Sequence, residues 1–141
     1  MLPEILENII KWNDIAQVPS NDSSMELYKN LITEEYTEFV TAFEKNKLVN
    51  YSDKDLETEE LDGIIDMVWV IIGYARARGW SNNTIYNAFK EVERSNYSKF
   101  VLESTGKYKC IKRDDGKILK PDTFSKAELR HIIDNNIYVS N

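Results

Sequence analysis

The sequence predicts an all-α fold, a four-helix bundle-like domain that ends in a short C-terminal arm or hairpin. Apolar residues recur at helical spacing in four segments, and the expected helix lengths suit a bundle. Only the tail alternates instead, around an Asp-Gly turn. At 141 residues, 42% hydrophobic and 30% charged, the chain is expected to form one domain (1–141) with a core at about 3–102 and an arm at about 103–141.

The first two helices are predicted from their apolar stripes. A helix over about residues 3–16 carries its apolar set at Ile5, Ile9, Ile10, Trp12 and Ile15. After a turn at 19–24, Ser23 and Glu26 make a capping box for a second helix, which runs to about Asn46. Its apolar stripe consists of Tyr28, Leu31, Ile32, Tyr36, Phe39 and Phe43.

The third helix is predicted over about 55–78, with Gly79 as its C-terminal stop. From Ile64 to Ala75 it is apolar almost all the way round, so it is expected to be buried among neighbouring helices. A fourth helix is expected from a cap at Ser81 to about Leu102. Beyond it, an extended arm or hairpin around Asp115-Gly116 precedes a brief last helix capped by Ser125 and Glu128.

Composition excludes several classes of function. The net charge of -6 argues against nonspecific nucleic-acid binding, and the apolar run 64–72 is too short to span a membrane. The N-terminus lacks the features of a signal peptide, and the single Cys110 leaves no intrachain disulfide, so a cytoplasmic protein is expected. One histidine, His131, rules out histidine-rich zinc sites. Any metal must accept oxygen ligands, which favours Mg²⁺ or Mn²⁺.

Acidic residues occupy positions where a helical core needs apolar ones. The first group is an E-E-x-x-E run, and the second begins twenty residues later at the start of the third helix. The two groups are Glu34, Glu35 and Glu38, and Glu59, Asp62 and Asp66. At 100° per residue the second group falls on one helix face. Within the first group, Glu35 and Glu38 border the apolar stripe of their helix, whereas Glu34 lies farther out and Glu60 is peripheral.

An isolated acidic run is most often a solvated surface, or pairs with lysine and arginine. Two observations favour a metal site instead: a second acidic cluster lies on an apolar helix, and lysines are scarce in both segments. Facing carboxylates repel unless a cation compensates their charge. Two facing helices with several carboxylates each would build a two-metal site suited to phosphoryl chemistry.

The fourth helix carries polar residues on its predicted inner face. Ile85, Phe89 and Val92 define this face, and Asn96 and Lys99 continue it. Lysine can supply a positive charge for a phosphate, and asparagine can bind a hydroxyl group or a base edge. The alternative is that Lys99 extends to solvent and Asn96 frays the helix end. Lys117 and Lys120, on either side of the Asp115-Gly116 turn, either close over a triphosphate or are ordinary surface lysines.

These motifs resemble the all-α nucleoside triphosphate pyrophosphatases, a superfamily that includes MazG, dimeric dUTPase and phosphoribosyl-ATP pyrophosphohydrolase. E-E-Y-T-E (34–38) and E-E-L-D-G-I-I-D (59–66) resemble its E-E-x-x-E and E-x-x-D signature, and 66–80 resembles the helix that follows in MazG-like proteins. E-V-E-R-S-N-Y-S-K (91–99) and D-D-G-K-I-L-K-P (114–121) are similar to a phage and bacterial branch described as phosphoribosyl-ATP pyrophosphohydrolase-like.

The resemblance implies Mg²⁺-dependent cleavage of a (deoxy)nucleoside triphosphate into a monophosphate and pyrophosphate. It implies metal ligands at Glu35, Glu38, Glu59 and Asp62, with Asp66 as a further ligand or a partner of one, and substrate contacts at Asn96 and Lys99. Glu34 or Glu35 would orient or deprotonate the attacking water, so Glu34, Glu35 and Glu38 are the candidate catalytic residues. Relatives form dimers or tetramers, which implies a homo-oligomer here.

The sequence departs from the family pattern at two positions, Gly63 and Tyr97. An alignment on Asp66 would place a ligand acid at Gly63, which leaves open whether Asp62 or Asp66 binds metal directly. Two other functions remain open. One is a helical regulatory or interaction module that binds a nucleotide or metal without turnover, and the other is phosphoribosyl-ATP hydrolysis.

Overall fold

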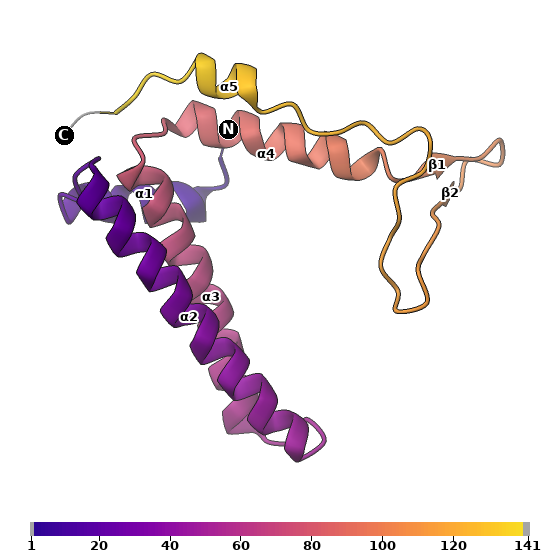
Figure 1. Ribbon diagram of the computed structural model, residues 1–141, viewed down its shortest axis with the longest axis horizontal. Coiled ribbons are helices and arrows are strands. Elements are labelled where there is room, and N and C mark those ends of the chain that lie inside the picture. Colours follow the sequence, from indigo (N-terminus) through magenta and orange to yellow (C-terminus); the bar gives the residue numbers. More distant parts are fainter. Residues whose placement is uncertain (1, 140–141) are drawn as a thin grey trace. The chain divides into compact units, whose positions relative to one another are not determined.

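A computed structural model describes residues 2–139, and it shows a mostly helical chain with four long helices. The all-α class is therefore confirmed. The chain divides into two compact units (Figure 1): a helical unit, Leu2–Ser81 with residues 137–139, and a C-terminal unit, Asn82–Asn136. The single domain expected over 1–141 stays a prediction.

The helical unit consists of α1 (Glu4–Ile15), α2 (Asp22–Leu48) and α3 (Lys54–Ala77). Long helices α2 and α3 lie side by side and antiparallel, joined by a short turn (Figure 1), and α1 packs on α3. The predicted boundaries are confirmed to within a few residues, and Gly79, at φ +84°, follows the end of α3. The predicted cap of α2 is wrong. Asn21, not Ser23, caps the helix, because its side chain accepts the Ser24 N–H at 2.8 Å.

A buried polar contact joins α1 to α2 where α3 passes close by. The hydroxyl group of Tyr28 donates to Asn13 Oδ1 at 2.7 Å, and Asn13 Nδ2 donates to the Ile9 carbonyl at 2.9 Å. Asn13 is fully buried. On α3, Gly73 leaves room for the Tyr28 ring, because a Cβ at Gly73 would meet the ring at 2.1 Å. Gly73 therefore sets how closely α2 and α3 approach at this level.

The prediction that α3 is buried on every side is wrong. One stripe along α3 is 41% to 62% exposed, and it consists of Leu61, Ile64, Ile65, Val68 and Ile71. The smaller predicted apolar sets are also only partly buried. Ile9, Ile10 and Tyr28 are buried, whereas Ile5, Trp12, Ile15 and Tyr36 are exposed. The reason is that α2 covers one face of α3 only, so the chain's apolar content exceeds what its own helices cover.

The C-terminal unit consists of α4 (Asn82–Tyr97), β1 (Val101–Leu102), β2 (Tyr108–Lys109) and α5 (Arg130–Asp134). Helix α4 begins directly after Ser81 but ends before the predicted Leu102, because residues 101–102 pair with β2 in an antiparallel hairpin. A second turn, closed by the Lys112–Ile118 bridge around Asp115-Gly116, confirms the predicted hairpin. Helix α5 lies beside α4 (Figure 1). The predicted α5 cap is wrong, since Leu129 precedes the helix without a side-chain cap.

Within residues 2–139, no helix has both the length and the apolarity needed to cross a bilayer.

Candidate functional site

The two acidic groups meet between the facing helices α2 and α3. Glu35 on α2 and Asp66 on α3 are half-buried, whereas Glu34, Glu38 and Glu59 are exposed. Asp62, one turn before Asp66, is exposed as well. Asp66 is therefore less withdrawn from water than the apolar run around it predicted. The graded exposure matches a site that opens to solvent along one side of the helix pair.

Glu35 is the carboxylate most affected by its neighbours. Its Oε2 atom is buried and has no hydrogen-bond partner. Burial raises the pKa of Glu35, and the negative charges of Glu38, Asp66 and Asp62 raise it further. Acids from both helices thus act on one side chain. The structure therefore brings together four of the five predicted metal ligands around Glu35.

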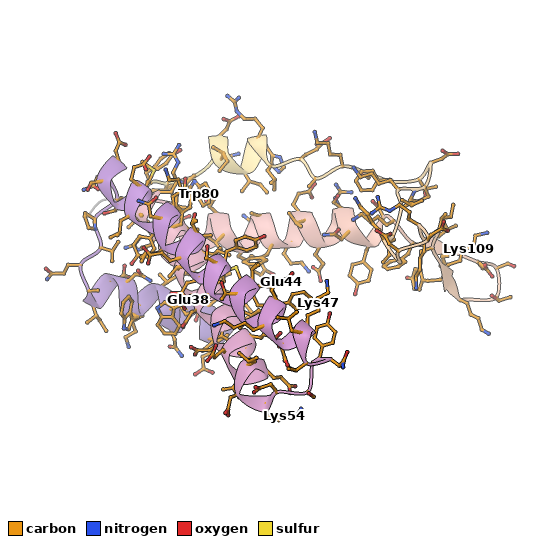
Figure 2. The ribbon with its side chains drawn as sticks, turned by 60° about the horizontal axis from the view of Figure 1, so that its bottom comes forward. Glu38, Glu44, Lys47, Lys54, Trp80 and Lys109 are labelled. Carbon is orange, nitrogen blue, oxygen red and sulfur yellow. The ribbon has the colours of Figure 1, made fainter. Side chains whose placement is uncertain are left out.

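The fifth predicted ligand, Glu59, shares a pocket with two of the others. Glu38, Glu59 and Asp62 line a surface pocket of about 270 Å³, which we call the acidic pocket. Figure 2 labels Glu38, which projects from α2 partway along the helix. Thr37 and Thr41 also line the pocket, and sequence analysis had not singled them out. Thr41 lies three residues after Glu38 and four after Thr37, so it shares a side of α2 with both, and that spacing is the signal that would have found it.

A close contact with α2 explains why position 63 holds glycine and not the acid of the family pattern. Gly63 is buried against α2, and a Cβ there would lie 3.1 Å from Phe39 Cβ and 3.2 Å from Phe39 N and Cα. A carboxylate side chain has no room at this contact. The neighbouring Asp62 lines the pocket, and both Asp62 and Asp66 raise the pKa of Glu35, so both stay candidate ligands.

The donor set fits a hard divalent cation. Every candidate is a carboxylate, the ligand type that Mg²⁺ prefers, and the unpartnered Glu35 Oε2 is a buried acceptor that a cation would satisfy. Among residues 2–139, no three His, Cys, Asp or Glu side chains are already arranged to hold a metal ion. Mutual repulsion keeps like-charged carboxylates apart. Binding a cation here requires these side chains to turn toward it.

Glu60 differs from its predicted peripheral role. It is half-buried, and its Oε1 atom is buried without a hydrogen-bond partner, as is Glu35 Oε2. No local pattern predicts this burial, because Glu60 lies away from the shared face of Glu59 and Asp62 on α3. Glu60 adds a second unpartnered carboxylate oxygen to this helix pair.

The predicted substrate-binding residues all belong to the C-terminal unit. Lys99 lies in the turn just beyond α4, so it does not continue the helix as predicted, but its Nζ donates to Asn96 Oδ1 on α4 at 3.0 Å and the two side chains are neighbours. Lys117 is exposed beside the Asp115-Gly116 turn. Lys120 lies 4.9 Å from the centroid of the Phe124 ring. The role of these four residues in substrate binding stays a prediction.

Comparison with known proteins adds no relative to this account. The sequence matches no protein-family model, and no curated protein matches it significantly.

Proposed function

We propose that this protein is a Mg²⁺-dependent nucleoside triphosphate pyrophosphohydrolase of the all-α, MazG-like type. It would convert a (d)NTP to a (d)NMP and pyrophosphate, in the control or cleansing of the nucleotide pool. The single observation that carries the proposal is the half-buried Glu35, whose pKa is raised by burial and by acids from both facing helices. Such a cluster is costly for folding alone, and perturbed carboxylates of this kind gather at functional sites.

The chemistry follows from the carboxylates and their different surroundings. Glu35, Glu38, Glu59, Asp62 and Asp66 would hold Mg²⁺ or Mn²⁺, which when bound polarises phosphate oxygens and lowers the pKa of a coordinated water. Glu35 is the preferred candidate to accept a proton from the attacking water, because its buried Oε2 atom has no hydrogen-bond partner in the protein and can accept one from a water molecule. Glu34, exposed beside it, is the alternative. Asn96 and Lys99 stay the predicted substrate contacts, with Lys117 and Lys120 as further candidates.

The test is to incubate the protein with each canonical (d)NTP and Mg²⁺ and to separate the products by chromatography. We expect monophosphate and pyrophosphate, and loss of both in Glu38→Gln. Glu44→Gln is the matched control, because Glu44 is an exposed acid on the same helix that does not line the acidic pocket (Figure 2). Activity that falls equally in both variants would contradict a role for the acidic pocket.

The panel also separates the competing functions. Tight nucleotide or Mn²⁺ binding without any product would favour a non-catalytic regulatory module. Turnover of phosphoribosyl-ATP in preference to every (d)NTP would favour the biosynthetic hydrolase.

We also propose that the protein is a homodimer or homotetramer. The exposed apolar stripe of α3 supports this proposal, because apolar side chains grouped on a protein surface often mark a site of protein–protein contact. Sedimentation of Ile65→Asp should give a smaller species than the original protein. Leu48→Asp, at an exposed apolar position at the end of α2, is the control and should leave the assembly unchanged. A monomer for the unmodified protein would overturn this proposal.

A further inference from the structure

The E-V-E-R-S-N-Y-S-K segment (91–99) forms the end of α4 and the turn that follows it, and its side chains lie on two opposite sides. Asn96 and Lys99 lie on one face, with the exposed Phe89 and Val92. Glu91, Arg94 and Ser98 lie on the opposite face, at helical spacing from one another. These three residues contact the segment 125–128, which follows the hairpins. Sequence analysis had assigned only the first face.

Four hydrogen bonds hold segment 125–128 against α4 and the turn that follows it. Arg94 Nη1 donates to Ser125 Oγ at 2.8 Å, and Arg94 Nη2 donates to the Lys126 carbonyl at 3.0 Å. The Ser125 N–H donates to Ser98 Oγ at 2.8 Å, and the Ser98 hydroxyl group itself donates to the Ser95 carbonyl at 2.6 Å. The Glu128 N–H donates to Glu91 Oε1 at 2.8 Å. We call Glu91, Arg94 and Ser98 the neck residues, and their hydrogen-bonded contact with segment 125–128 the neck.

Charge within the neck holds it in this arrangement. Glu91 accepts two hydrogen bonds from Arg94, at 2.9 Å and 2.7 Å, in a bidentate pair. Arg94 lowers the pKa of Glu91 to about 2, with the Glu128 N–H as the second cause. Glu91 therefore stays charged at neutral pH and keeps Arg94 directed at Ser125 and Lys126.

The neck closes a basic loop, residues 99–124, at both of its ends. The loop contains seven lysine and arginine residues and four acidic ones, a net charge of +3 in a chain of net charge -6. Within residues 2–139, the side chains of Lys107, Lys109, Lys112 and Lys117 form no ion pair or hydrogen bond. Figure 2 labels Lys109 on β2, in the arm beyond the end of α4. The fold thus presents unpaired cations on a loop that is tied at its base.

We propose that Glu91, Arg94 and Ser98 are positioning residues that hold this basic loop in place to bind the polyphosphate of the nucleotide. The inference rests on the proposed function for the identity of the substrate. The effect of the neck on affinity does not depend on that identity. Without the neck bonds the loop samples more conformations, so ordering the loop on binding costs more entropy and weakens the affinity for polyphosphate. Polyphosphate affinity should fall while the chemical step is spared.

Ser98→Ala is the sharpest variant, because it removes one hydroxyl group and leaves the Arg94–Glu91 pair intact. Thr123→Ala is its matched control, since Thr123 is an exposed hydroxyl residue of the loop for which no neck bond exists. Ser98→Thr should restore the bond. Arg94→Gln is a second variant that breaks the neck at another point. Circular dichroism should show that each variant keeps its helices.

Two readouts test positioning separately from catalysis. Calorimetry with inorganic tripolyphosphate should show Ser98→Ala binding about three- to tenfold more weakly, the range set by one net hydrogen bond. For the preferred (d)NTP, KM should rise by a similar factor while kcat stays within about twofold, as expected when binding rather than the chemical step is weakened. Hydrogen exchange in residues 99–124 should become faster in Ser98→Ala and Arg94→Gln and stay unchanged in Thr123→Ala.

The outcomes distinguish this inference from the proposed function. A protein that binds tripolyphosphate more weakly in Ser98→Ala than in Thr123→Ala, but hydrolyses no nucleotide, would refute the enzyme and support the positioning of the loop. Hydrolysis with no tripolyphosphate binding, or with equal KM in Ser98→Ala and Thr123→Ala, would overturn the positioning role. Faster exchange in the loop with unchanged affinity would overturn it too, since the neck would then be structural only.

Discussion

Gly63 on α3 packs directly against Phe39 on α2, so closely that a Cβ at Gly63 would lie 3.1 Å from Phe39 Cβ. These residues are the immediate neighbours of Asp62 and Glu38, which line the acidic pocket. The contact therefore sets the separation of the two helices where their carboxylates face each other. Close approach and charge repulsion act in opposition at this level, and the apolar contact holds the acids together.

Gly63→Ala should separate the helices at this contact. Alanine normally stabilises a helix relative to glycine by up to about 1 kcal/mol. Here we expect the opposite sign, a loss of about 1–3 kcal/mol in the free energy of unfolding, because backbone as well as side-chain atoms of Phe39 oppose the new methyl group. Urea denaturation measures it. A variant more stable than the original protein would show that the helices do not meet this closely.

Glu35→Gln should trade activity for stability. The folded-state pKa of Glu35 lies above its ordinary value, so its contribution to stability is present at acid pH and is lost as pH rises through the folded pKa. At pH 7 the charged carboxylate therefore destabilises the fold, and its removal should raise the melting temperature. Activity should fall by about 100-fold or more if Glu35 is the base.

The control for Glu35→Gln is Glu44→Gln, which should change neither quantity. The gain in melting temperature should shrink as the pH falls through the raised pKa of Glu35, because the carboxyl group then becomes protonated in the original protein as well. Addition of Mg²⁺ should also reduce the difference, because a bound cation relieves the repulsion. A gain that is the same at every pH would contradict the proposed origin of the raised pKa.

Tyr28→Phe should destabilise the helical unit. It removes the hydroxyl group that bonds to the fully buried Asn13 Oδ1 and leaves that oxygen without a donor, at a cost of about 1–3 kcal/mol. Tyr36→Phe is the matched control on the same helix, because Tyr36 is 56% exposed and should lose almost nothing. Equal losses in the two variants, measured by urea denaturation, would argue against the buried contact.

Lowering the pH should break the hydrogen bonds of the neck in the C-terminal unit. The pKa of Glu91 is lowered to about 2, so the neck is held above pH 4.5, the ordinary value, and is lost as pH falls from there toward 2. Hydrogen exchange of the Glu128 amide should accelerate across that interval beyond the intrinsic pH dependence. In Glu91→Ala, which removes the acceptor, the amide should exchange fast throughout. A Glu128 amide that stays protected in Glu91→Ala would show that Glu91 does not hold the segment.

Much of the fold follows from local patterns in the chain. Apolar periodicity located α1, α2 and α3 to within a few residues, and Gly79 marked the end of α3 because only a residue tolerant of positive φ suits that position. The juxtaposition of Glu35 with Asp62 and Asp66 was also predictable. Two helices joined by a short turn must run antiparallel, and the acids lie at similar distances from that turn.

Other features depend on contacts that no local pattern encodes. Asn21 and Ser23 are both good caps, and a single hydrogen bond to Ser24 N decides between them. The apolar run in α3 predicted burial, but periodicity does not say whether the covering surface belongs to the same chain. The neck joins residues about 30 positions apart, so Ser125 resembled a helix cap when only its neighbours were considered.

The position of bond cleavage tests the central claim most directly. Phosphorus-31 NMR of the protein with its preferred (d)NTP and Mg²⁺ should show a nucleoside monophosphate signal and a pyrophosphate signal that grow together. The pyrophosphate signal should grow twice as fast because it comes from two equivalent phosphorus atoms, and neither signal should appear in Glu38→Gln. Orthophosphate with nucleoside diphosphate as the first products, or an unchanged triphosphate spectrum for every nucleotide, would contradict the account.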